Sequence, residues 1–180
     1  MAGRITDPDV QILAGISETL RGDYVKQDDA WIGSPFAWIK TRVSRTRGKI
    51  GEQLVAGWCA AKGLDVTRAT SSEHDRIIEG RKTEIKFSTL WESGVYKFQQ
   101  IREQDYEMAI CLGIAPFDAR CWVIPKHVLR THVIGHTGQH GGSSGTDTAW
   151  ISTPPDGLNW MKEWGGNLAI AFRVLQRLRA

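Results

Sequence analysis

The most regular pattern of hydrophobic and polar positions lies in residues 49–62, KIGEQLVAGWCAAK. Apolar side chains recur there at helical spacing, and Gly63 follows where helices commonly end in a left-handed residue. The pattern predicts a largely buried helix. Two further helices are expected, one from about Pro8 to Leu20 and an amphipathic one over residues 167–179.

Extended segments follow the helix predicted over 49–62. Residues 64–69, 75–80 and 82–89 are strand-like, and the last two predict a hairpin that turns near Gly80. Residues 98–105 are compatible with a helix. The continuous apolar run 106–114 predicts a central strand covered on both faces, and residues 121–125 predict a strand that leads into a short helix at 126–129. The order predicts an α/β fold with a mixed central sheet, in one domain spanning residues 1–180.

One charged residue interrupts the apolar pattern of the 49–62 helix. Glu52 has Val55, Ala56 and Cys59 at the spacings i+3, i+4 and i+7, which share its side of a helix. A buried carboxylate costs several kcal/mol unless a partner compensates its charge. Either this edge of the helix is exposed, or Glu52 meets a cation.

The residues that carry chemistry lie on the predicted hairpin. In a strand, Glu84 and Lys86 project to one face roughly 6.6 Å apart, while Ile85 and Phe87 enter the core. If the hairpin loop is centred on Gly80-Arg81, Asp75 lies opposite Lys86 and shares the face of Glu84. Two carboxylates could hold Mg²⁺ beside a phosphate, and the lysine could orient the attacking water.

These residues resemble the PD-(D/E)xK nuclease superfamily over residues 48–125, with Asp75 as the motif aspartate, Glu84 and Lys86 as its E-x-K, and Glu52 as the acid of the first helix. His74 stands where the motif name has proline. The resemblance implies a restriction-endonuclease-like core, a mixed central β-sheet flanked by helices. It also implies a Mg²⁺ site, which Mn²⁺ can also fill, formed by Asp75, Glu84, Ile85 and Glu52.

The bare motif has an ordinary alternative interpretation. An acid-x-lysine tripeptide is expected about once by chance in a chain of this length. Glu84 and Lys86 could therefore form a salt-bridge ladder on a solvated strand. The catalytic interpretation is favoured because this tripeptide is the only one of its kind in the chain and follows a predicted turn.

Several residues outside the motif are candidates for DNA contacts. The formal net charge of +3 is only mildly basic, but Arg45, Arg47 and Lys49 belong to a basic run that could bind phosphates. A solvated charged surface is the alternative. Gln100 follows the motif strands where the superfamily often places polar residues. The Gly/Ser/His-rich segment 135–146 predicts a loop in which two residues could contact DNA, His140 and Ser143.

Together these features predict a Mg²⁺-dependent endonuclease that hydrolyses double-stranded DNA, of the type II restriction kind. The alternatives are a structure-specific repair or recombination nuclease, and a non-catalytic DNA-binding module with the same fold. A homodimer would match a palindromic target. Three cysteines without Cys-x-x-Cys spacing indicate reduced core thiols. We expect a cytoplasmic protein without membrane contact, since neither a signal peptide nor a membrane-length apolar stretch is recognised.

Overall fold

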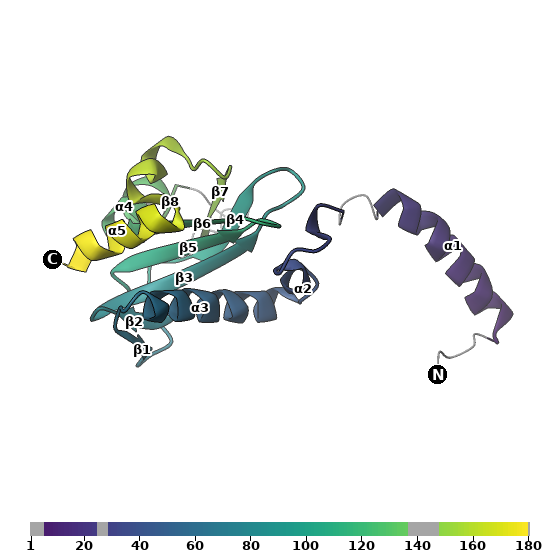
Figure 1. Cartoon of the computed structure of the whole chain (residues 1–180), viewed down its shortest axis with the longest axis horizontal. Coiled ribbons are helices and arrows are strands. Elements are labelled where there is room, and N and C mark those ends of the chain that lie inside the picture. The colour runs from purple at the N-terminus through teal and green to yellow at the C-terminus, as the bar shows by residue number, and fades with distance from the viewer. Residues whose placement is uncertain (1–5, 25–28, 137–147, 180) are drawn as a thin grey trace.

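The central element of the fold is a six-stranded mixed sheet with the order β1-β2-β3-β5-β6-β8 (Figure 1). The computed structural model describes residues 6–24, 29–136 and 148–179. Strands β3 and β5 are parallel, and every other neighbouring pair of this sheet is antiparallel. The strands are β1 (Val66–Arg68), β2 (Arg76–Ile78), β3 (Arg81–Thr89), β5 (Met108–Ile114), β6 (Ala119–Pro125) and β8 (Gly165–Asn167).

Helices cover both faces of this sheet, as predicted for the α/β class. On one face pack α3 (Ser44–Ala61) and α5 (Leu168–Arg179). The other face carries a second sheet of β4 (Tyr96–Ile101) and β7 (Ala149–Thr153), with α4 (Lys126–His132) and the 3-10 helix η3 (Asn159–Trp164). The chain also forms η2 (Asp29–Trp31) and α2 (Ala37–Lys40), which precede α3.

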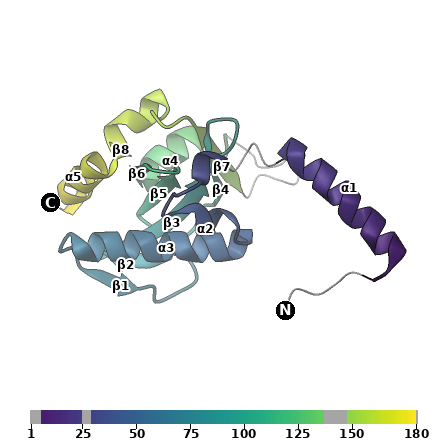
Figure 2. The ribbon, with the colours of Figure 1, turned by 45° about the vertical axis from the view of Figure 1, so that its right-hand side comes forward.

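Helix α1 (Pro8–Tyr24) lies apart from the sheet in both views of the chain (Figures 1 and 2). It includes the helix predicted from Pro8 to Leu20 and continues beyond it. Its apolar side chains Ile12, Leu13 and Ile16 are exposed. Among the described residues, no helix combines the length and the apolar character needed to cross a membrane.

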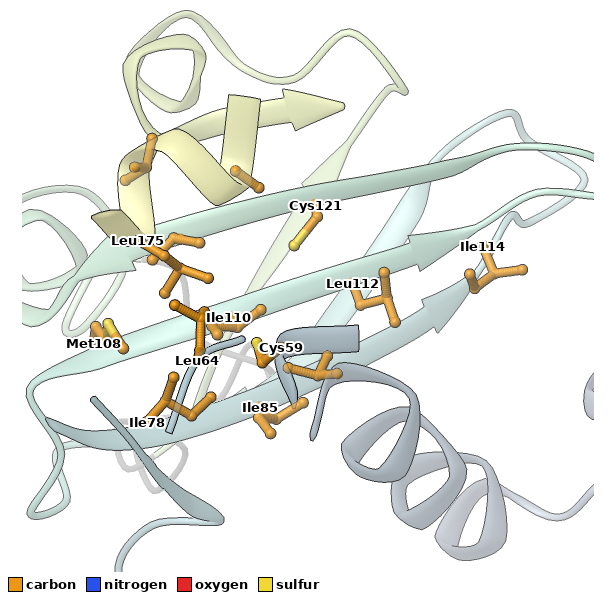
Figure 3. Close-up of a cluster of buried hydrophobic side chains, with 14 of the residues drawn as sticks. Cys59, Leu64, Ile78, Ile85, Met108, Ile110, Leu112, Ile114, Cys121 and Leu175 are labelled. Atoms are coloured by element: carbon orange, nitrogen blue, oxygen red, sulfur yellow. The ribbon is translucent and has the colours of Figure 1, made fainter. Parts of the chain in front are cut away.

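The central strand β5 is buried on both faces, which confirms the prediction from its continuous apolar run. Ile110 and Leu112 pack with Ile85 toward α3 and α5 (Figure 3). Ala109 and Cys111 face the opposite way, into the core formed with β4, β7 and α4. All three cysteines are buried and unpaired, as the sequence predicted.

The turn between β2 and β3 differs from the prediction. Ile78 pairs with Arg81, so the two loop residues are Glu79 and Gly80. Both have positive φ, 51° and 76°, as the tight type I′ hairpin requires. This register places Asp75 beside Glu84. The predicted pairing of Asp75 opposite Lys86 is wrong by two residues, because a glutamate at positive φ is uncommon and the sequence pointed to Gly80-Arg81.

The helix predicted over residues 98–105 is also wrong. Strand β4 occupies the first half of this segment and pairs with β7, far along the chain. Phe98 and Ile101 are buried in the core beneath this small sheet. Burial against distant residues therefore overrides the helix-compatible composition of the segment.

Candidate active site

The candidate site lies along an open edge of β3. Strand β2 pairs only with the first three residues of β3, Arg81 to Thr83. Beyond Thr83, β3 continues beside a cleft of about 710 Å³, which the first half of α3 and strand β4 also line. All four predicted catalytic residues line this cleft: Glu52, Asp75, Glu84 and Lys86.

Asp75 bonds directly to the edge that β2 leaves open. Its Oδ2 accepts a hydrogen bond from the backbone N–H of Ile85, with an N···O distance of 2.7 Å. The carbonyl of Ile85 points to the same edge, because the N–H and C=O groups of one strand residue share a side. The turn of the hairpin therefore brings a carboxylate and a backbone carbonyl to one point of the cleft.

Glu84 and Lys86 form an ion pair on the face of β3 opposite Ile85. Lys86 Nζ donates to Glu84 Oε1 at 2.6 Å, and only 14% and 10% of the two side chains are exposed. Burial raises the pKa of Glu84 above its usual range; Lys86 opposes this rise, and the charge of Asp75 adds to it. The salt bridge of the alternative interpretation is therefore present, but it is mostly buried and lines a cleft, whereas that interpretation placed it on a solvated strand.

Glu52 reaches the cleft because α3 packs unusually close to β3. A Cβ atom on Gly51 would lie 2.3 Å from Cβ of Phe87, so only glycine permits this contact. Glu52 Oε2 lies 3.7 Å from Arg76 Nη1. Burial raises the pKa of Glu52, and the charge of Asp75 raises it further. The sequence left two explanations for the charge of Glu52, and the structure shows elements of both, since the side chain is partly exposed and lies near the cation Arg76.

The donor set fits a magnesium ion. Mg²⁺ is usually bound by one or two carboxylates together with waters, and Asp75 and Glu84 supply two adjacent carboxylates. Within the described residues, no three His, Cys, Asp or Glu side chains are close enough to hold one ion. Coordination of a metal ion therefore stays a prediction for all four expected ligands: Asp75, Glu84, Glu52 and the carbonyl of Ile85.

The predicted DNA-contact residues divide into three groups. Arg45, Arg47 and Gln100 line the cleft. Lys49 is exposed outside the cleft lining, although its charge lowers the pKa of Glu52. The remaining two lie outside the described residues, and their predicted contacts stay predictions: His140 and Ser143.

Sequence reasoning missed two cations of the cleft region. Arg76 Nη1 donates to the backbone oxygen of Asp75 at 2.7 Å and lies beside Glu52. Lys97 lines the cleft, with Nζ 3.9 Å from the ring centroid of Trp91. The position of Arg76 directly after Asp75 in the sequence could have indicated a place near the site. The sequence offers no such signal for Lys97, because the pattern around it does not identify β4 as a strand.

Comparisons with known proteins give little beyond this geometry. No family model matches the chain. No curated protein matches it either. One solved structure that resembles it is a bacterial homing endonuclease, I-Ssp6803I, with a TM-score of 0.47 and 15% sequence identity over 74% of this chain and 93% of that chain. A likeness this distant says nothing about activity, so a functional assignment rests on the cleft itself.

Proposed function

We propose that this protein is a Mg²⁺-dependent endonuclease that hydrolyses phosphodiester bonds of double-stranded DNA, in the manner of a type II restriction enzyme. The observation that carries the proposal is the meeting of Asp75, Glu84 and Lys86 at one open strand edge inside a cleft. The arginines of α3 line the same cleft and supply positive charge for phosphates.

Each residue of this set has a distinct task in phosphodiester hydrolysis. Asp75 and Glu84 would hold the metal ion, which when bound stabilises the negative charge that develops on the phosphate. Lys86 Nζ, fixed by Glu84, is available to donate a hydrogen bond to the attacking water and orient it. Arg45 and Arg47 would hold the flanking phosphates and so fix the position of the scissile bond.

The acidic residues also bear on the non-catalytic alternative. A module that only binds DNA gains nothing from two adjacent carboxylates in its cleft, because they repel the phosphates. Their burial beside Lys86 adds a desolvation cost that a binding surface does not need. Such an arrangement would be favourable if Asp75 and Glu84 held a divalent ion, which would supply positive charge beside the phosphate.

Cleavage assays separate the three candidate functions. We expect discrete fragments when plasmid and phage DNA are incubated with the protein and Mg²⁺, and no cleavage in EDTA. Glu84→Gln should abolish cutting, whereas the matched change Glu163→Gln, at an exposed position of η3, should not. Cutting of branched DNA alone would identify a structure-specific nuclease. Gel shifts without cleavage of any substrate would contradict the proposed activity.

A further inference from the structure

Strand β4 contains a bulge that faces the cleft. Phe98 pairs with Ile151 and Ile101 pairs with Ala149, so Gln99 and Gln100 together oppose one residue of β7. The buried side chains on either side of the bulge, Phe98 and Ile101, point into the core. Both glutamines are exposed and line the cleft. The extra residue therefore places two consecutive amides on the cleft side, and the next side chain, that of Ile101, again points into the core.

Gln100 has a backbone conformation that glycine would adopt more easily. Its φ is +57°, in the left-handed region, which costs a non-glycine residue about 1–2 kcal/mol. Among the described residues, the other non-glycine residue with positive φ is Glu79. The hairpin turn requires that conformation, and Glu79 Oε1 accepts a hydrogen bond from the N–H of Asp65.

No comparable internal role accounts for the side chain of Gln100. It is exposed, so it does not pack in the core. Within residues 6–24, 29–136 and 148–179 its amide makes no hydrogen bond. A strained position that keeps an exposed, unbonded amide inside a cleft indicates that this amide serves a bound ligand.

We propose that Gln100 determines sequence specificity by hydrogen bonding to a base edge of duplex DNA held in the cleft. The inference rests on the proposed function, since it requires DNA at this site. A carboxamide presents one donor and one acceptor side by side, which matches the N6 and N7 atoms of adenine in the major groove. Besides Lys86, three cations line the same cleft and suit phosphates better than a neutral amide does: Arg45, Arg47 and Lys97.

The choice of variant separates a base contact from a structural role. Gln100→Gly removes the amide but keeps the left-handed backbone, so the fold and its melting temperature should be preserved or improved. Gln104→Ala is the matched control, because it removes the same amide four residues later, outside the cleft lining.

The experiment is the selection of bound duplexes from a random DNA pool, in Ca²⁺ to limit cleavage. Wild type and Gln104→Ala should enrich the same sequence. Gln100→Gly should lose the preference at one or two base pairs, with discrimination against a single-base variant falling about 5- to 100-fold. Its affinity for an unrelated duplex should stay within about twofold, since phosphate contacts supply most of that binding.

Several results would overturn the inference. Gln100→Gly could enrich the wild-type sequence with undiminished discrimination, or the wild-type pool could show no sequence preference. An equal loss in Gln104→Ala would also contradict a specific role for the cleft residue. Failure of the proposed function is read separately, as the absence of Mg²⁺-dependent cleavage by the wild-type protein.

Discussion

Lys86→Ala should separate catalysis from DNA binding. Removal of the amine takes away the group that we propose orients the attacking water, and such assistance typically contributes a factor of about 10² to 10⁴ in rate. The backbone of β3 and the packing of Ile85 should remain, because Lys86 projects to the opposite face. Duplex binding in Ca²⁺ should persist or strengthen slightly, because phosphate contacts elsewhere supply most of the affinity.

The same change should have a measurable effect on stability. Lys86 is the hydrogen-bonded cation of Glu84, and its loss leaves that mostly buried carboxylate beside Asp75 without compensation. Loss of one partner of a fully buried ion pair costs about 3–5 kcal/mol, and the access of this pair to the cleft should reduce the cost to about 1–3 kcal/mol at neutral pH. The Glu84→Gln/Lys86→Ala double variant should regain much of the lost stability, because no unpaired charge remains. Urea denaturation at pH 7 measures both effects.

Single-turnover cleavage at saturating enzyme measures the catalytic effect. The matched control is Lys82→Ala, on the same strand, because Lys82 pairs with Asp105 in an exposed ion pair outside the cleft lining. This control should cleave at nearly the parental rate. If a folded Lys86→Ala variant also cleaves within about threefold of the parent, Glu84 and Lys86 form only a salt bridge and the assigned site is wrong.

Three further predictions test other parts of the cleft and its supports. Arg45→Ala and Arg47→Ala should each weaken binding to all duplexes. Each should also lower the slope of the logarithm of the binding constant against the logarithm of the salt concentration by about one; an unchanged slope would show that the arginines contact solvent rather than phosphates. Gly51→Ala should cost about 1–3 kcal/mol in urea denaturation and reduce cleavage, because its methyl group would displace Phe87; an unchanged stability would contradict the close approach. Glu103→Gln tests a pH dependence. Hydrogen bonds from Arg130 and Lys126 of α4 hold the pKa of Glu103 at about 2. The contribution of this pairing to stability is therefore present above about pH 4.3 and is lost as pH falls toward 2. Glu103 and its partner Arg130 are solvent-exposed, so the variant should lose less than about 1 kcal/mol at pH 7 and show no difference from the parent below pH 2; an equal difference at both pH values would refute the assignment.

The sequence predicted those parts of the fold that each element's own residues decide. The apolar run of β5 identified a central strand, since the side chains on both of its faces are apolar and buried. The sequence of β4 resembles that of a helix, because a bulge brings both Phe98 and Ile101 to the core face and so breaks the alternation typical of a strand. Its partner β7 lies far along the chain, and no local pattern reveals such a pairing.

The candidate site shows the same division. The sequence identified Asp75, Glu84 and Lys86, because spacing on a strand determines which side chains share a face. It misplaced Asp75 by two residues, since the turn contains an uncommon positive φ at Glu79. It missed Lys97, whose place in the cleft depends on the packing of β4 over the central sheet.

Metal-dependent cleavage by an Asp75→Asn variant tests the central claim most directly. Asp75 holds the backbone of Ile85 and is one of the two carboxylates expected to bind the ion, so the amide should remove Mg²⁺-dependent cleavage of phage DNA while the protein stays folded. Asp65→Asn, at an exposed position before β1, is the matched control and should cleave like the parent. The account predicts cutting by the parent and by this control in Mg²⁺, and none by Asp75→Asn. Undiminished cutting by Asp75→Asn, or cutting by the parent in EDTA, would contradict it.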